Sequence, residues 1–195
     1  MAPRRSCTGV AIYKREVMRI HVGCGARVMD GYFNIDAQHH RNAPRAPDLL
    51  YAFEFDAEGN LITQIPLEDG VADEILGVHV FEHFHRWTCD AVAKEWGRLL
   101  KPGGVLILEL PNLIKCCQNI IDGREGRHPD QLGRWGLYGD PRDKDMYMCH
   151  PWGWAPEELM SFLAGHGFKS IKDVPTKFHS CGKLNRDMRI EAVKA

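Results

Sequence analysis

The chain has 195 residues and a mass of 22.2 kDa, which suits one domain of moderate size and excludes two full domains. Hydrophobic residues make up 44% of the sequence and charged residues 26%, so enough apolar side chains are present to fill a core and wholesale disorder is excluded. The formal net charge is -1, which gives no overall attraction to nucleic acid or to an anionic membrane.

Residues 1–17 carry basic side chains but lack the apolar core of a secretory signal, and we expect them to form an extension before a domain over residues 18–195. The apolar runs are of strand length, and none approaches the roughly 20 residues of a membrane helix. The seven cysteines form no CxxC pair, so reduced thiols are expected rather than a disulfide framework. These features predict a cytoplasmic protein.

Strands and helices alternate along the chain. Segments rich in β-branched, aromatic and aliphatic residues predict strands at 19–22, 31–36, 48–55, 74–80, 105–110, 168–174 and 188–193. Apolar residues at helical spacing predict a helix at 88–100. A short helix is expected at 113–121, and the acidic first turn and closing glycine predict another at 156–165. Thr88 is expected to cap the first of these helices, and Pro156 opens the last. The alternation indicates an α/β fold with a mainly parallel sheet.

The turn Gly23–Cys24–Gly25 follows the first predicted strand, and Asp36 ends the second. Ligands of parallel sheets bind beyond the carboxyl ends of the strands, so we expect this turn, Asp36, Asp56 and residues 81–83 to converge. A turn without side chains lets the backbone approach a ligand, and a carboxylate can accept two hydrogen bonds from a ribose diol. The turn lacks the third glycine of a dinucleotide-binding fingerprint, and Asp36 lies closer to Gly25 in the sequence than the acidic residue of that fingerprint lies to its glycines. The pattern therefore indicates a ligand with a ribose but no pyrophosphate.

Five segments, in order, resemble motifs of the class I S-adenosylmethionine (SAM)-dependent methyltransferases. They are residues 19–25, 34–36, 65–73, 79–84 and 98–104. Each motif is loose alone, but the five in register are specific. The resemblance implies a Rossmann-like, doubly wound, mainly parallel seven-stranded sheet with SAM as the cofactor. The short link from Gly25 to Asp36 resembles a subgroup of small predicted methyltransferases with a reduced first helix.

The resemblance also implies which residues hold the cofactor. The glycine turn would approach its methionine part, and Asp36 would hold its ribose hydroxyls. Asp56 and the backbone of residues 65–66 would lie near the adenine, although Asp56 could equally be a solvated turn residue. The full implied set is Gly23, Cys24, Gly25, Asp36, Asp56, Ile65, Pro66 and His79.

Residues 79–83 also match the His-x-x-Glu-His pattern of zinc peptidases. That motif needs a helix that presents both histidines on one face. Gly77 and Val78 favour the end of a strand, and the helix signals begin only near Thr88. We therefore expect no metal. Glu82 and His83 are expected to act near the transferred methyl group or the acceptor, unless the histidines only pack in the wall of the site.

Residues 111–154 form an insertion that the core fold does not need, and long loops of this kind are commonly lids or binding surfaces. Its interleaved arginines and aromatics could stack on a sugar or base, or could form an ordinary surface loop. His150, followed by Pro-Trp-Gly, resembles a histidine-tryptophan-glycine element of related small methyltransferases. It is the acceptor-side candidate, with a structural imidazole as the alternative. The predicted catalytic set is His150, His83 and Glu82.

The implied reaction is in-line attack by an oxygen or nitrogen of a small-molecule or sugar acceptor on the sulfonium methyl group, with S-adenosylhomocysteine as the leaving group. Positioning in a dry pocket would supply most of the acceleration, and His150 or His83 could act as a base if the acceptor must lose a proton. A non-catalytic SAM-binding module and a nucleic-acid-modifying enzyme are the alternatives. The first is disfavoured by the retained cofactor motifs, and the second by the net charge and the lack of a Pro-Pro-Tyr/Trp motif.

Overall fold

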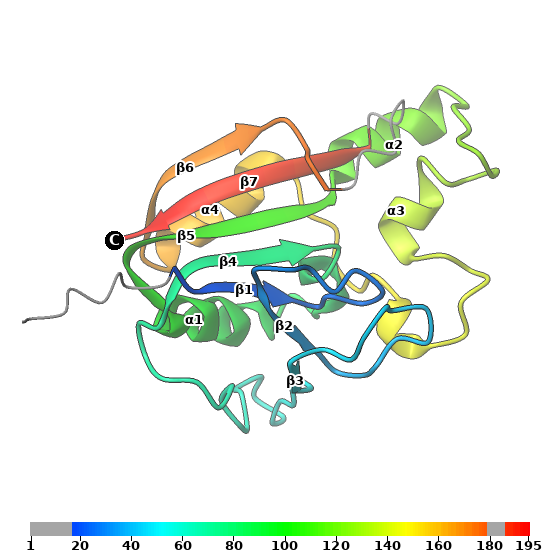
Figure 1. The fold of residues 1–195 in the computed structure, drawn as a ribbon. Coiled ribbons are helices and arrows are strands. Elements are labelled where there is room, and N and C mark those ends of the chain that lie inside the picture. The colour runs from blue at the N-terminus through cyan, green and yellow to red at the C-terminus, as the bar shows by residue number, and fades with distance from the viewer. Residues whose placement is uncertain (1–16, 179–185) are drawn as a thin grey trace, which may run out of the picture.

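A computed structural model describes residues 17–178 and 186–195, so the expected extension lies outside the described residues except for Val17. A seven-stranded sheet in the order β3-β2-β1-β4-β5-β7-β6 forms its centre (Figure 1). The strands are β1 (Arg19–Val22), β2 (Phe33–Asp36), β3 (Leu49–Leu50), β4 (Ala72–Val78), β5 (Leu100–Pro111), β6 (Phe168–Val174) and β7 (Asp187–Lys194). Among the described strands, β7 runs antiparallel to the other six. The predicted Rossmann-like, mainly parallel α/β fold is confirmed.

Two helices pack on one face of the sheet and enclose the hydrophobic core. They are α1 (Cys89–Leu99) and α4 (Pro156–Gly165). Trp96 of α1 and Leu159 of α4 are fully buried in the same cluster as Ile20 of β1 and Leu106 of β5. This burial explains the apolar periodicity of both helices. Within the described residues every helix is too short or too polar to cross a lipid bilayer.

The remaining helical segments lie beyond the carboxyl ends of the parallel strands (Figure 1). They are the 3-10 turn η1 (Phe81–His83), the helices α2 (Leu113–Ile121) and α3 (Arg134–Tyr138), and the 3-10 turn η2 (Met146–Met148). The insertion therefore adds its helices at the edge of the sheet where the predicted ligand site lies.

Two local predictions need correction. The strand predicted over residues 48–55 pairs in the sheet only at Leu49–Leu50, because the following residues turn away and place Phe53 against Phe84 with ring centroids 5.0 Å apart. Thr88 does precede α1, but its hydroxyl donates to the carbonyl of His85 at 2.9 Å and makes no capping bond to the helix.

No helix joins β1 to β2 in the described chain, although the two strands are parallel. The fully buried side chain of Asn34 in β2 organises this short connection. Its Nδ2 donates to the carbonyls of Met29 and Tyr32 at 2.9 and 2.8 Å, and its Oδ1 accepts from the amide of Met29 at 2.8 Å. One amide side chain thus replaces the hydrogen bonds that a crossover helix would make internally.

We predict that Asn34→Ala destabilises the fold, because the partners of Asn34 lose their hydrogen bonds in a partly buried connection. The expected loss in the free energy of unfolding is about 1 to 3 kcal/mol, measured by urea denaturation. Asn42→Ala, at an exposed loop position, is the control and should change stability little. Equal stability of the two variants would contradict this role for Asn34.

Candidate functional site

The glycine turn at the end of β1 is packed closely on one side and open on another. Gly23 has a φ of +62° and Gly25 a φ of +52°, values that disfavour other residues. A Cβ on Gly23 would lie 2.5 Å from Val80 Cγ2, so the turn is seated against the residues that follow β4. A Cβ on Gly25 would meet nothing within 4 Å. The open side of Gly25 leaves room for a ligand next to the backbone.

The carboxylate of Asp36 faces this turn from the end of β2. Its Oδ2 accepts the amide N–H of Gly25 at 2.7 Å, and its Oδ1 accepts the amide of Gln38 at 3.1 Å. A carboxylate can accept about four hydrogen bonds, so both oxygens keep capacity for the hydroxyls of a ribose. These residues fit SAM. Cys24 between the glycines is buried, and burial raises the pKa of its thiol to about 11.

The carboxylate of Asp56 makes hydrogen bonds within its own loop. Its carboxylate accepts from the amides of Glu58 and Asn60 at 3.1 and 2.8 Å and from the Asn60 side chain at 3.0 Å. The Asn60 amide lowers the pKa of Asp56 below its ordinary value. The loop packs against Trp87, since a Cβ on Gly59 would lie 2.7 Å from that ring. Contact of Asp56 with an adenine therefore stays a prediction.

Ile65 and Pro66 lie against helix α1, and their expected place near the adenine stays a prediction. The amide of Ile65 donates to Glu95 Oε1 at 2.8 Å, and its carbonyl accepts from Arg98 Nη2 at 3.0 Å. Glu95 and Arg98 belong to the second half of α1, whose end leads directly into the first residue of β5. These bonds hold the segment toward the amino ends of the strands.

His79 follows β4 with a φ of +52° and lies between two carboxylates. Its Nδ1 is 3.1 Å from Glu82 Oε1, and its Nε2 is 3.3 Å from Asp187 Oδ2 at the start of β7. Burial alone would lower the pKa of His79, but the two carboxylates raise it. Burial alone would likewise raise the pKa of Glu82, but contact with His79 lowers it. His79 and Glu82 therefore form a buried ion pair.

The pattern of residues 79–83 does not form the helix of a zinc peptidase. The 3-10 turn begins at Phe81, after His79, and is three residues long. His79 is paired with Asp187, whereas the other histidine, His83, faces the insertion and bonds to the carbonyl of Cys149. The two histidines of the motif therefore contact different parts of the chain.

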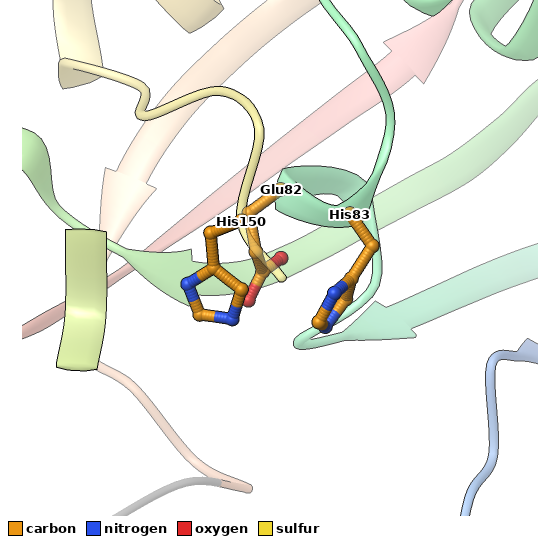
Figure 2. Close-up of side chains that lie close together, drawn as sticks. All are labelled: Glu82, His83 and His150. Atoms are coloured by element: carbon orange, nitrogen blue, oxygen red, sulfur yellow. The ribbon is translucent and has the colours of Figure 1, made fainter. Parts of the chain in front are cut away.

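Glu82, His83 and His150 meet in one cluster. One ligand atom from each of the three lies within 4.8 Å of the others, and Figure 2 shows the carboxylate pointing toward the space between the two rings. The imidazole centroids are 4.7 Å apart, with the rings nearly perpendicular. The structure thus brings together the three residues that the sequence predicts as catalytic, from two segments far apart in the chain.

Backbone carbonyls orient both imidazoles of the cluster. Nδ1 of His83 lies 2.9 Å from the carbonyl of Cys149, and Nδ1 of His150 lies 3.0 Å from the carbonyl of Gly136. Because a carbonyl can only accept, Nδ1 carries the proton in each contact. Burial lowers the pKa of His150. Its neutral ring therefore presents an unprotonated Nε2 to the cluster.

The insertion positions His150 through α3, which the sequence did not predict. A Cβ on Gly136 would lie 2.4 Å from Cys116 Sγ of α2, so α3 can pack on α2 only because this residue is glycine. Besides its carbonyl bond to Gly136, His150 donates its amide N–H to the carbonyl of Tyr138 at 3.4 Å. The packing of α3 on α2 therefore fixes the place of His150.

The aromatic residues of the insertion have three different surroundings. Trp154 is fully buried and stacks on Phe81 at 5.4 Å, so it belongs to the core. The guanidinium of Arg142 lies over the ring of Trp135, 4.5 Å from its centroid. Tyr138 and Tyr147 are 69% and 73% exposed, which leaves these two rings available for a ligand.

Sequence analysis missed Asp187, which faces His79 and is itself paired with Arg186 at 2.7 Å. Its one signal is an acidic residue directly before a predicted apolar strand. Nothing local links it to His79, because 108 residues separate the two. The partner becomes visible only when β7 is aligned with β5.

Comparisons with known proteins relate this fold to methyltransferases. Residues 20–108 match a family model described as a methyltransferase domain, while no curated protein matches the sequence. A SAM-dependent methyltransferase from Archaeoglobus fulgidus is 17% identical, with a TM-score of 0.59 over 93% of this chain and 88% of its own. One from Thermotoga maritima, a possible histamine N-methyltransferase, is 20% identical, with a TM-score of 0.56 over 91% and 82%.

The CurJ carbon methyltransferase is also similar, at 17% identity and a TM-score of 0.52 over 95% of this chain and 50% of its own. The sheet of this chain has the Rossmann-like fold of these methyltransferases. Residues 20–108 thus match a methyltransferase domain, and the chain has the fold of SAM-dependent methyltransferases, whose cofactor is SAM.

We predict that Asp36→Ala weakens cofactor binding by about tenfold to a hundredfold, the effect of losing one charge-assisted hydrogen bond. Calorimetry with S-adenosylhomocysteine measures the change. Asp30→Ala, which removes an exposed carboxylate from the same connection, should bind like the parent. Asp36→Asn keeps an oxygen for Gly25 N–H and so separates turn distortion from ribose contact. Parental affinity in a folded Asp36→Ala variant would show that Asp36 only closes the turn.

Proposed function

We propose that this methyltransferase acts on an oxygen or nitrogen nucleophile of a small molecule or sugar, and that transfer is an in-line displacement. SAM supplies the methyl group on a sulfonium centre and leaves as S-adenosylhomocysteine. The observation that carries the proposal is the cluster of Glu82, His83 and His150 beyond the carboxyl ends of the strands. Two oriented imidazole rings beside a buried carboxylate suit an acceptor whose X–H bond is polar.

Two features of the insertion support a compact acceptor. The exposed ring of Tyr138 lies on the helix that holds His150, so an acceptor ring can stack next to the cluster. His83 and His150 are each fixed by a carbonyl, which gives them one orientation toward the acceptor. Fixed groups accelerate a displacement mainly by holding the reacting atoms in line.

The charges of the insertion argue against a nucleic-acid acceptor. Three of its arginines pair with neighbouring aspartates: Arg124 with Asp122, Arg134 with Asp130, and Arg142 with Asp140. Phosphate binding draws on cationic side chains and accounts for most non-specific affinity for nucleic acid. Pairing of these arginines and a net charge of -1 leave little basis for that affinity. A non-catalytic SAM-binding module would not need the oriented cluster.

The acceptor class is tested by incubating the protein with methyl-labelled SAM and separate pools of sugars, small metabolites and nucleic acid. We expect the label in the sugar or small-metabolite pool, on oxygen or nitrogen. Label on nucleic acid alone, or on carbon, would overturn the proposal.

We predict that His150→Ala lowers methyl transfer by about 10²- to 10⁴-fold, the usual contribution of a group that handles the acceptor proton, and leaves cofactor affinity near the parental value. Single-turnover rates at saturating SAM measure the first effect, and calorimetry the second. His85→Ala removes an exposed histidine outside the cluster and should change neither. A loss of cofactor binding in His150→Ala would instead place His150 in the cofactor pocket.

A further inference from the structure

We propose that Glu82, His83 and His150 bind one divalent transition-metal ion. The sequence alone favours no metal, because residues 79–83 are not helical. The proposed site does not use the two histidines of that motif. His150 from the insertion takes the place of His79 as the second imidazole. Two imidazoles and one carboxylate form a common three-residue metal site with open coordination positions.

The donor atoms are near one another and aimed at a common space. Metal–ligand bonds of about 2.0 to 2.2 Å place donor atoms roughly 3 to 3.5 Å apart. The three ligand atoms lie within 4.8 Å of one another. Side-chain rotations that shorten these separations by up to roughly 1.5 Å would bring all three atoms to metal-binding distance. Figure 2 shows the carboxylate directed between the two rings, as a shared ion requires.

The buried carboxylate of Glu82 points to a ligand. Its side chain is 2% exposed, and within the described residues Oε2 accepts no hydrogen bond. A buried carboxylate oxygen without a partner is costly. A cation placed between Glu82, His83 and His150 would satisfy that oxygen.

The surrounding residues have the arrangement that metal sites use to orient their ligands. Metal-bound imidazoles usually donate their other ring N–H to a carbonyl or carboxylate. Both His83 and His150 do so, toward the carbonyls of Cys149 and Gly136. Ligating carboxylates are likewise held from behind, and here His79 contacts Glu82 Oε1 and is held in turn by Asp187.

The donor set selects the kind of ion. Imidazole nitrogens suit Fe²⁺, Ni²⁺ and Zn²⁺, and the mixed nitrogen and oxygen set also accepts Mn²⁺ and Co²⁺, whereas Mg²⁺ and Ca²⁺ prefer all-oxygen ligands. Three protein ligands leave positions for other oxygens. On the proposed function, on which this step rests, an ion here would bind an acceptor hydroxyl and lower the pKa of that hydroxyl, as bound metals do for water, so that its proton is released to solvent. The acceptor class would then be a hydroxylated molecule.

The ion is tested by direct binding, without any acceptor. The full chain, freed of metal by a chelator, is titrated with Mn²⁺ by electron paramagnetic resonance and with Co²⁺ by visible absorption, with Mg²⁺ as the contrasting ion. We expect one Mn²⁺ or Co²⁺ per chain and much weaker binding of Mg²⁺. The Co²⁺ spectrum should show nitrogen and oxygen ligation without thiolate bands.

Variants assign the ligands. Glu82→Gln, His83→Ala and His150→Ala should each weaken Mn²⁺ binding at least about tenfold, whereas His85→Ala and Cys149→Ser, which alter neighbouring residues outside the set, should not. Binding of S-adenosylhomocysteine confirms that each variant is folded; if Glu82→Gln does not fold, the two histidine variants decide. Absence of ion binding, thiolate bands, or undiminished binding in the ligand variants would overturn the metal site. None of these results would bear on methyl transfer itself, which the labelled-SAM assay measures separately.

Discussion

The pairing of β4 with β1 on one side and β5 on the other is the constraint on which the site depends. Val22 lies opposite Gly77, and Gly77 lies opposite Leu108, so the three strands reach the same edge of the sheet together. Gly77 permits this approach, because a Cβ there would lie 2.9 Å from Val80 and 3.1 Å from Leu108. Every segment that leaves this edge is therefore brought against its neighbours.

The antiparallel strand β7 supplies charge partners to that edge. Buried charges are tolerated mainly when they are paired. Asp187 of β7 faces His79 after β4, and Arg189 of β7 lies 3.3 Å from the buried carboxylate of Glu109 in β5. Glu109 also accepts the backbone amides of Lys177 and Phe178. The last strand thus stabilises charges that the parallel strands carry and could not pair among themselves.

The parts that sequence analysis predicted are those fixed by local chemistry. A glycine turn after an apolar strand, and a carboxylate at the end of the next, mark the region of Gly25 and Asp36 without knowledge of the fold. The opening proline and the acidic residues after it likewise identified the α4 segment from Pro156. What sequence analysis missed depends on distant residues. Asp187 was missed because its partner His79 lies 108 residues away in the chain.

The five-residue helix α3 shows the same limit. It contains a glycine and is too short for a periodic apolar pattern, so only its contact with α2 reveals it. His150 was identified from its sequence neighbours, but the carbonyl that orients it comes from that unpredicted helix. The sequence therefore identified His150 but not the helix that orients it.

The use of main-chain carbonyls to orient both imidazoles has an evolutionary consequence. Residues 136 and 149 contribute their peptide oxygens rather than their side chains, and at position 136 only the small size of glycine matters for packing. Side chains elsewhere on the insertion, such as the exposed Tyr138 and Tyr147, can change without moving the cluster as long as the backbone path is kept. The scaffold thereby separates the evolution of acceptor preference from the preservation of reactive geometry.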